Sequence, residues 1–183
     1  MRIIAGRFRG KKIKAPKGLA TRPVLARVRE ALFNVIGDIE GTRVLDLYAG
    51  TGAVGIEALS RGAKSLVAVE KGYSQYRTIK ENLSVMGIEA KVFRVKVNTA
   101  LEKLSIAGEK FDFVFADPPY ESGLASKAVE SVFERGLISE SGIMAVTVRK
   151  KEDLPTEGGT YTMVFDRSYG DTRLAIYKMK KND

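Results

Sequence analysis

The stretch Val44-Leu45-Asp46-Leu47-Tyr48-Ala49-Gly50-Thr51-Gly52 decides the fold class of this chain. Residues 44–48 form a short apolar run that predicts a buried strand, and the two glycines that follow combine with Gly55 in a G-x-G-x-x-G pattern. Such a turn lets the backbone approach a ligand closely and leads into the N-terminus of a helix. The stretch therefore predicts the first strand, turn and helix of an α/β domain. The alternative is a glycine-rich turn that binds no ligand.

The alternation of strand and helix continues along the chain after this first unit. Strands joined by helices imply right-handed crossovers and a parallel sheet with helices on both faces. A final hairpin would place one antiparallel strand among the parallel ones. The predicted strands are residues 44–48, 65–69, 90–97, 111–116 and 143–148, with hairpin strands 161–165 and 174–178 joined through 166–171, and the predicted helices are 53–61, 73–86, 99–104 and 124–134.

Residues 1–40 have a different pattern from the rest of the chain. Residues 2–6 and 11–15 are typical of two short strands that flank a basic turn. A linker with Pro16 and Pro23 follows, and apolar residues then recur with helical spacing over residues 24–36, where Gly37 is a natural end. We therefore divide the chain into a basic N-terminal extension, residues 1–40, and an α/β domain, residues 41–183.

The positive charge of the chain is concentrated in this extension. The formal net charge is +9 with an isoelectric point near 9.7, and residues 1–40 carry +7 of that charge. This concentration favours a nucleic-acid face over a merely solubilising surface. For Arg27 and Arg29, pairing with Glu30 or with helix neighbours is an equally good prediction. The predicted RNA-binding residues are Arg7, Arg9, Lys11, Lys12, Arg22, Arg27 and Arg29.

Two residue types that often serve in catalysis or metal binding are absent, and their absence excludes several reactions. The chain has no cysteine and no histidine. It therefore has no disulfide, no thiolate zinc site and no Ser-His-Asp triad. Methyl transfer to C5 of a pyrimidine is excluded as well, because that reaction needs a cysteine nucleophile. The chemistry must use carboxylates, Tyr, Lys, backbone groups or an organic cofactor, and no metal is expected.

The composition is that of an ordinary globular protein. Hydrophobic residues make up 44% and charged residues 29% of the chain, in the usual range for a soluble domain. No apolar run approaches the roughly 18 residues that a membrane-spanning helix requires. The first six residues are too short and too basic for the apolar segment of a signal peptide. We therefore expect a cytoplasmic protein without a membrane partner.

Two acidic residues identify the ligand that the first turn would bind. Glu70 ends the second predicted strand 20 residues after Gly50, the spacing expected of an acid that binds ribose hydroxyls. Asp46 stands immediately before the turn, where its charge would oppose a pyrophosphate. S-adenosylmethionine has no phosphate but carries an ammonium and a sulfonium group. The two carboxylates therefore favour this methyl donor over a dinucleotide.

The tetrapeptide Asp117-Pro118-Pro119-Tyr120 follows the fourth predicted strand, at the sheet edge where ligands bind. Two prolines fix the backbone and leave carbonyls free in a rigid turn. The carboxylate and a carbonyl can accept both N–H protons of an exocyclic amine, so that the nitrogen lone pair can attack a methyl group. The Tyr120 ring can stack on a base that has left its helix. The alternative is a proline turn that only ends a strand.

These motifs and the blocks around them resemble class I S-adenosylmethionine-dependent methyltransferases, and more closely the bacterial family that methylates guanine N2 in 16S ribosomal RNA (methyltransferase D type). The resemblance covers nearly the whole chain. The Asp-Pro-Pro-Tyr motif is shared with adenine-N6 enzymes, whereas two other blocks, residues 27–34 and 57–63, are more specific to this family. The residues that carry the resemblance are 2–6, Gly10, Arg22-Pro23, 27–34, 45–52, 55–63, 117–120 and 169–172.

The resemblance implies a Rossmann-like, seven-stranded, mostly parallel sheet with one antiparallel strand, and an N-terminal hairpin and helix that touch ribosomal RNA. Two positions depart from the family pattern. Val24 stands where members often carry Thr, and Asn98 stands where an acidic residue commonly contacts adenine. The expected cofactor-binding residues are Asp46, Tyr48, Ala49, Gly50, Gly52, Glu70, Lys71, Asn98, Thr99 and Asp117, and the expected catalytic residues are Asp117, Pro118, Pro119 and Tyr120.

Three functions are compatible with the sequence. The leading one is transfer of a methyl group from S-adenosylmethionine, with S-adenosylhomocysteine as product, to N2 of a guanine in 16S rRNA. The substrate would be the free rRNA, the small ribosomal subunit or an assembly intermediate, and a monomer is the default state. The runner-up is an adenine-N6 methyltransferase that acts on DNA or RNA. The third is an RNA-binding or assembly protein that keeps the fold without catalysis.

Overall fold

The computed structural model describes residues 1–16, 23–119 and 123–181. Apolar residues with a period of two or of 3.6 account for most of the elements found in this part of the chain. The helices are α1 (Pro23–Ile36), α2 (Ala53–Ser60), α3 (Tyr73–Val85), α4 (Val97–Ile106) and α5 (Leu124–Glu134). The strands are β1 (Arg43–Leu47), β2 (Ser65–Val69), β3 (Lys91–Phe93), β4 (Phe111–Ala116), β5 (Ile138–Arg149), β6 (Tyr161–Tyr169) and β7 (Thr172–Met179).

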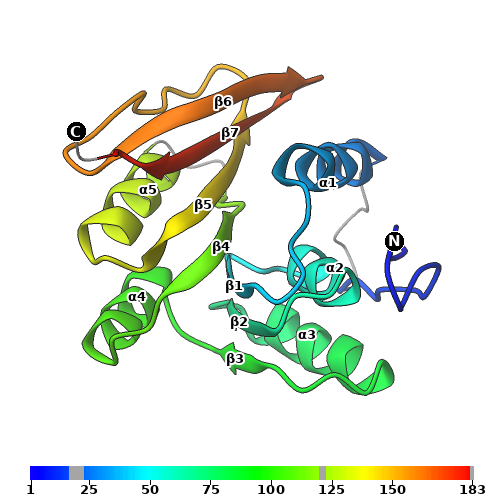
Figure 1. The fold of residues 1–183 in the computed structure, drawn as a ribbon. Helices are drawn as coiled ribbons and strands as arrows, with labels where there is room; N and C mark the ends of the chain where they lie inside the picture. The colour runs from blue at the N-terminus through cyan, green and yellow to red at the C-terminus, as the bar shows by residue number, and fades with distance from the viewer. Residues whose placement is uncertain (17–22, 120–122, 182–183) are drawn as a thin grey trace.

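The strands form one seven-stranded sheet with the order β3-β2-β1-β4-β5-β7-β6 (Figure 1). Strands β1 to β5 pair in parallel, and β7 pairs antiparallel with both β5 and β6. The predicted Rossmann-like sheet with one antiparallel strand is confirmed. Because β1 lies at the centre of the parallel part, the loops that follow β1, β2 and β4 meet at one edge of the sheet.

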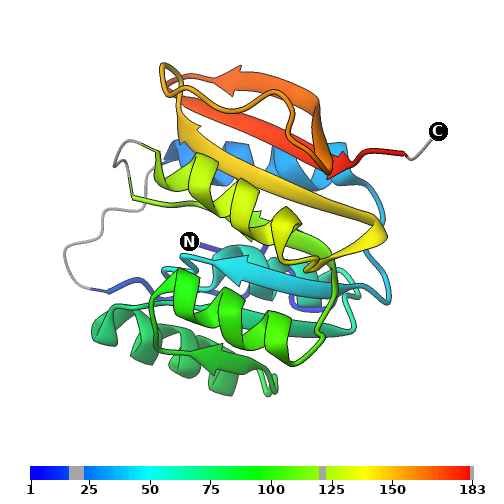
Figure 2. The ribbon, with the colours of Figure 1, turned by 90° about the vertical axis from the view of Figure 1, so that its left-hand side faces the viewer.

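Helices cover both faces of the sheet (Figures 1 and 2). α1, α2 and α3 lie on one face, and α4 and α5 lie on the other. Successive residues of a strand point to opposite faces, so β1 contributes Val44 to the first layer and both Leu45 and Leu47 to the second. Asp46 therefore points to the same face as Val44, toward α2, although it is a carboxylate within a buried strand.

The N-terminal segment pairs with itself less than the sequence predicts. A single antiparallel bridge joins Arg2 and Lys12, and residues 2–6 and 11–15 form no regular strands. Hydrogen bonds cross between the halves of the segment, from the Ile3 amide to the Lys11 carbonyl at 3.0 Å and from the Ile13 amide to the Met1 carbonyl at 2.9 Å, but other amides bond to α2 instead. The Ile4 and Ala5 amides donate to the Glu57 carboxylate at 2.8 and 3.0 Å, and the Phe8 amide donates to the Ser60 hydroxyl at 3.0 Å.

Glu57 is the main anchor of the N-terminal segment. Its side chain is fully buried, and it also accepts a hydrogen bond from Arg61 at 3.0 Å and lies 3.7 Å from Arg29 of α1. Asn82 of α3 provides a second anchor, because its side chain exchanges two hydrogen bonds with the Lys14 backbone. The apolar residues Ile3, Phe8, Ile13, Leu32 and Phe33 belong to the same core cluster as the central strands. The boundary between residues 40 and 41 stays a prediction.

Five other elements, β3, α4, β5, β6 and β7, differ clearly in length from the prediction. β3 ends at Phe93 rather than at residue 97, and α4 begins at Val97, so Asn98 and Thr99 lie in the first turn of a helix. β5 begins at Ile138, ahead of a register shift against β4. The final hairpin is longer than predicted, because β6 continues to Tyr169 and β7 starts at Thr172. An exposed edge strand needs few apolar residues, which explains why the sequence pattern of residues 166–169 does not predict a strand.

Candidate active site

The turn after β1 has the backbone geometry that its glycines predict. Gly50 and Gly52 have φ angles of 56° and 75°, a left-handed conformation that glycine adopts without strain. Tyr48, which is not a glycine, has a φ of 57°. Such a conformation is costly for a residue with a Cβ and is concentrated at functional sites. The Asp46 carboxylate lies beneath this turn and accepts a hydrogen bond of 3.0 Å from the Gly55 amide of α2.

Glu70 connects the turn after β1 to the end of β2. Its carboxylate accepts hydrogen bonds from the Gly50 amide at 3.0 Å and from the Gly72 amide at 2.7 Å. Each carboxylate oxygen can accept more than one hydrogen bond, so Glu70 can still bind hydroxyl groups of a ligand. These two contacts hold the carboxylate at the sheet edge beside the glycine turn, where the sequence predicted a ribose-binding acid.

Asp117 lies directly after β4, at the same edge of the sheet. Its side chain is half-buried and accepts a hydrogen bond of 2.6 Å from the Thr147 hydroxyl of β5. Burial raises the pKa of the Asp117 carboxyl, and the Thr147 hydrogen bond opposes that rise. Pro118 is buried and Pro119 is exposed, so the turn is anchored on one side and open on the other. Tyr120 lies outside the described residues.

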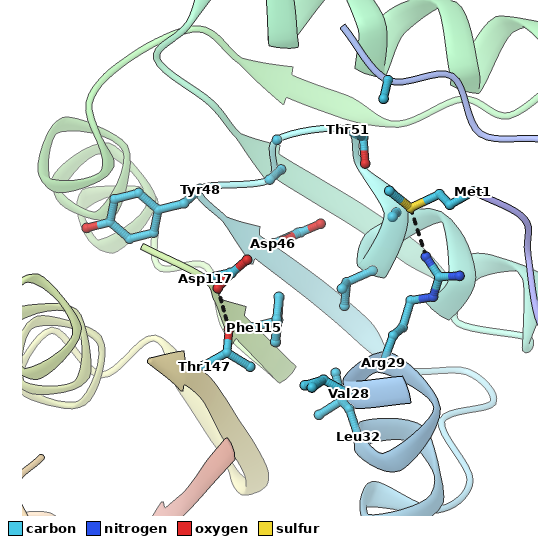
Figure 3. A pocket seen from close by; sticks show the side chains of 15 residues that line it. Met1, Val28, Arg29, Leu32, Asp46, Tyr48, Thr51, Phe115, Asp117 and Thr147 are labelled. Atoms are coloured by element: carbon cyan, nitrogen blue, oxygen red, sulfur yellow. Dashed lines mark hydrogen bonds between the residues drawn. The ribbon is translucent and has the colours of Figure 1, made fainter. Parts of the chain in front are cut away.

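A pocket of about 200 Å³ lies between Asp46, Asp117 and the glycine turn (Figure 3), whereas Glu70 and Gly52 are outside its lining. Asp46, Tyr48 and Asp117 line it from the sheet, while Met1 and Arg29 line it from the N-terminal region. Figure 3 shows the two carboxylates near one another, with Arg29 and Met1 at the other side of the pocket. The remaining lining residues are Ala15, Val28, Leu32, Ala49, Gly50, Thr51, Ala53, Val54, Phe115 and Thr147.

Arg29 is placed differently from its predicted role as a surface contact for RNA. Its side chain is only 5% exposed, and it donates hydrogen bonds to the Arg2 carbonyl at 2.6 Å and to the Met1 sulfur at 3.2 Å. Its partner acid is Glu57 on α2, not Glu30 or a neighbour on its own helix. The reason is that Arg29 lies on the face of α1 that packs over α2. The guanidinium therefore helps to build the pocket wall.

The other predicted basic residues are at the surface where they are described. Arg7, Arg9, Lys11, Lys12 and Arg27 are exposed. Arg7 and Lys11 lie over the Phe8 ring, at 4.4 and 5.2 Å from its centroid, and Arg22 lies outside the described residues. These positions leave the loop at residues 7–12 as the most strongly basic part of the extension.

The remaining predicted cofactor residues lie around the same edge without lining the pocket. Lys71 follows Glu70 and is exposed. Asn98 and Thr99 are exposed in the first turn of α4, and the Asn98 amide oxygen accepts a hydrogen bond of 3.1 Å from Arg135. The Asn98 side chain is therefore held by α5 and keeps one further acceptor position for a ligand.

The sequence reasoning missed the residues that close the pocket. Thr147 sits in the middle of an apolar strand, and a polar residue at such a position was the available signal. Phe115, Val28 and Leu32 carried no signal beyond that of core residues. Met1 and Ala15 could not be found from sequence, because only the fold brings the N-terminal segment beside Arg29 of α1.

The carboxyl of Asp46 has a strongly raised pKa. Burial raises the pKa of its carboxyl to about 7, the Asp117 and Glu70 carboxylates add to the rise, and the Gly55 amide opposes it. An unfolded Asp loses its proton near pH 4. Between about pH 4 and pH 7 the folded state thus binds more protons than the unfolded state, so the ligand-free fold loses stability as pH rises through that window. A ligand with a positive charge beside Asp46 would reverse this trend.

The acidity of Asp46 predicts a pH-dependent affinity for a cationic ligand. We expect the affinity for S-adenosylmethionine to rise about tenfold per pH unit below pH 7 and to level off above it, because only ionised Asp46 attracts the cation. Calorimetry between pH 6 and pH 8.5 measures this, with proton release as a second readout. The Asp46→Asn variant should bind weakly with no such slope. An equal slope in that variant would assign the titration to another group.

The described residues contain no group of His, Cys, Asp and Glu side chains that could hold a metal ion. Within the same part of the chain, no helix is long and apolar enough to cross a membrane. The sheet order, the glycine turn after β1, the acid at the end of β2 and the Asp-Pro-Pro turn after β4 together define a class I methyltransferase. The chain is an S-adenosylmethionine-dependent enzyme of this class.

Comparison with known proteins places the chain more narrowly. It belongs to the family described as Conserved hypothetical protein 95, which it matches over residues 1–178. It is 30% identical to the Ribosomal RNA small subunit methyltransferase D of Escherichia coli K12, over 97% of this chain and 89% of that protein. It is 34% identical to the Bacillus subtilis protein YlbH, which carries a provisional rRNA methyltransferase name, over 98% of this chain and 100% of that protein.

A more distant solved structure shares the fold. The 16S rRNA N2 G1207 methyltransferase of Thermus thermophilus, solved with AdoMet and guanosine, superposes with a TM-score of 0.70 at 20% identity. The match covers 90% of this chain and 45% of that one. This likeness shows that the two chains share the fold.

Proposed function

We propose that this enzyme transfers a methyl group from S-adenosylmethionine to the exocyclic N2 amine of a guanine in 16S ribosomal RNA. The observation that carries the proposal is the Asp117 carboxylate, which is held by Thr147 and faces the pocket formed by the glycine turn. The name of the Escherichia coli relative supports the rRNA substrate, and the guanosine complex of the distant neighbour supports the base. We further propose that the enzyme works in the cytoplasm on free rRNA, the small subunit or an assembly intermediate.

The pocket fits the charge pattern of the methyl donor. One wall carries the Asp46 carboxylate, and the other carries the Arg29 guanidinium (Figure 3). The amino-acid end of S-adenosylmethionine is a zwitterion. A site with both signs of charge therefore binds this group better than it would bind a pyrophosphate. Glu70, fixed by the Gly50 and Gly72 amides, would bind the ribose hydroxyls, and Asn98 and Thr99 would lie toward the adenine. The bound cofactor supplies an electrophilic methyl group.

The Asp-Pro-Pro turn supplies what the acceptor amine needs. The N2 lone pair of guanine is delocalised into the ring, so the amine is a poor nucleophile in its planar form. The Asp117 carboxylate and the Pro118 carbonyl would accept its two N–H protons and favour a tetrahedral nitrogen. Asp117 would also stabilise the positive charge that develops on nitrogen as the new bond forms. Because Thr147 and the prolines fix the turn, this stabilisation needs little reorganisation at the moment of reaction.

The acceptor base is tested by comparing rRNA from cells with and without this gene. Mapping modified nucleotides at single-base resolution should show one guanine of 16S rRNA that loses its N2 methyl group when the gene is deleted. Restoring the gene should restore the methyl group. Loss of an N6-methyladenine instead would favour the runner-up function, and an unchanged map would exclude 16S rRNA as the substrate.

The basic loop of the extension gives an independent prediction about RNA. We expect charge reversal at Arg7, Arg9 and Lys12 to weaken RNA binding strongly and to flatten its dependence on salt, because fewer counterions are released on binding. Cofactor affinity should not change, because none of these residues lines the pocket. Binding isotherms at several salt concentrations measure both effects. Charge reversal at Lys103 on α4 is the control. An unaltered salt slope in the triple variant would show that the loop does not contact the RNA.

A further inference from the structure

A second aromatic and basic cluster lies at the ligand edge of the sheet, on elements other than the N-terminal extension. It consists of Tyr73, Arg77 and Arg94. Tyr73 is the first residue of α3, and its side chain is 59% exposed. The Arg94 and Arg77 guanidiniums lie 5.4 and 5.9 Å from the centre of its ring. Tyr adds little to the stability of a helix at its first residue. Helix formation therefore does not explain an exposed ring that is flanked by two guanidiniums.

The fold places this cluster close to the cofactor site. Glu70 holds the Gly72 amide, and Gly72 is the residue before Tyr73. On the other side, Phe93 pairs with Val69 in the sheet and accepts a hydrogen bond of 3.0 Å from the Glu70 amide, so Arg94 emerges beside Glu70. The same carboxylate that would bind the cofactor ribose thus fixes the backbone on which the Tyr73 ring stands.

The charges around the ring favour a polyanionic ligand. Lys71 and Lys96 are exposed on the segments that lead to Tyr73 and away from Arg94. Glu81 is the exposed acid of α3 in this region, and it is engaged by both Arg77 at 3.7 Å and Lys14 at 3.8 Å. Guanidiniums bind phosphates well, and an aromatic ring offers a face to any base. The cluster combines both features within one turn of a helix and one strand end.

We propose that Tyr73, with Arg77 and Arg94, is a stacking platform for an unpaired nucleotide of the RNA substrate. The ring takes a base on its face, and the two guanidiniums turn from the ring to the neighbouring phosphates. Their distances from the ring lie near the outer limit of a cation–π contact, and the ion pair of Arg77 with Glu81 is exposed and therefore weak, so this exchange gives up little. The platform would hold the strand at the cofactor edge while the target base enters the pocket. This proposal rests on the proposed RNA substrate and is independent of which base is methylated.

Equilibrium binding of a short single-stranded oligoribonucleotide to the full chain tests the platform directly. The Tyr73→Ala variant should bind the RNA about tenfold more weakly, and Tyr73→Phe, which keeps the ring, should stay within about twofold of the parent. Arg94→Ala should weaken binding and reduce its salt slope by about one charge. With 2-aminopurine in the oligonucleotide, the parent should quench its fluorescence on binding and Tyr73→Ala should quench it less. Val85→Ala, an equally exposed change on α3, is the matched control.

The outcomes separate this proposal from the proposed function. If the parent binds the RNA and Tyr73→Ala binds it equally well with equal quenching, the platform is wrong and RNA methylation is untouched. If Tyr73→Ala loses affinity while its melting temperature and its affinity for S-adenosylmethionine stay unchanged, the platform stands, whichever base the enzyme methylates. A parent chain that does not bind the oligoribonucleotide would overturn the platform, while methylation of rRNA within the small subunit or an assembly intermediate would be tested separately by nucleotide mapping.

Discussion

Replacing Asp117 by alanine is expected to lower kcat by about a thousandfold or more, with little change in the affinity for S-adenosylmethionine. The carboxylate belongs to the first residue of the Asp-Pro-Pro turn, and its partner is the Thr147 hydroxyl rather than a residue that shapes the cofactor turn. Single-turnover methylation with labelled donor measures the loss of rate, and calorimetry measures the retained cofactor binding. Full activity in the Asp117→Ala variant would contradict the catalytic role of Asp117.

Thr147 supplies a graded control for the same carboxylate. Its hydrogen bond opposes the burial that raises the pKa of Asp117, so Thr147→Val should raise that pKa further. The amine protons need an ionised acceptor, and activity therefore falls as pH drops through this pKa. We expect the acid limb of the kcat profile to move to higher pH in Thr147→Val, with the plateau at high pH largely kept. An unmoved acid limb would show that the profile reports another group.

Replacing Gly6 by alanine is expected to destabilise the fold by about 3 kcal/mol and to lower the melting temperature by about 10 °C. Gly6 has a φ of 80°, and a Cβ built there would lie 1.7 Å from the Ser60 carbonyl oxygen of α2. The backbone cannot yield without breaking the bond of 2.8 Å from the Arg7 amide to that carbonyl. Activity should fall as well, because the same segment brings Met1 to the pocket.

Gly10 is a matched control for this substitution. It has a φ of 81°, but a Cβ there would meet nothing within 4 Å. Gly10→Ala should therefore cost only the conformational strain, about 1 kcal/mol. Thermal unfolding of the three proteins under one set of conditions gives the comparison. Equal losses in the two variants would show that the N-terminal segment does not depend on its close approach to α2.

The sheet and the ligand edge were predictable because their signals are local. An apolar run that contains one acid and is followed by glycines identifies β1, Asp46 and the turn after the strand without any knowledge of distant residues. Glu70 and Asp117 were predictable for the same reason, since each directly follows an apolar strand. The residues that close the pocket were not predictable in this way. Arg29 has the same sequence signature as an RNA-contacting arginine, and only its burial against Glu57 and Met1 reveals a different position.

The N-terminal segment shows why the hairpin prediction was too regular. Alternating residues with a basic turn predict two strands, and one bridge between Arg2 and Lys12 does form. The Ile4, Ala5 and Phe8 amides find acceptors on α2, at the Glu57 carboxylate and the Ser60 hydroxyl. Long-range partners of this kind override the local preference for strand pairing, and no local sequence pattern predicts them.

The nature of the methylated nucleoside tests the central claim most directly. The purified chain would be incubated with labelled S-adenosylmethionine and with small-subunit particles or rRNA that lack the modification, in parallel with the Asp117→Ala variant. The RNA would then be digested to nucleosides and the labelled product identified by mass and retention. We predict N2-methylguanosine as the product of the parent chain and none from the variant. Label in N6-methyladenosine, or equal label from the variant, would contradict the account.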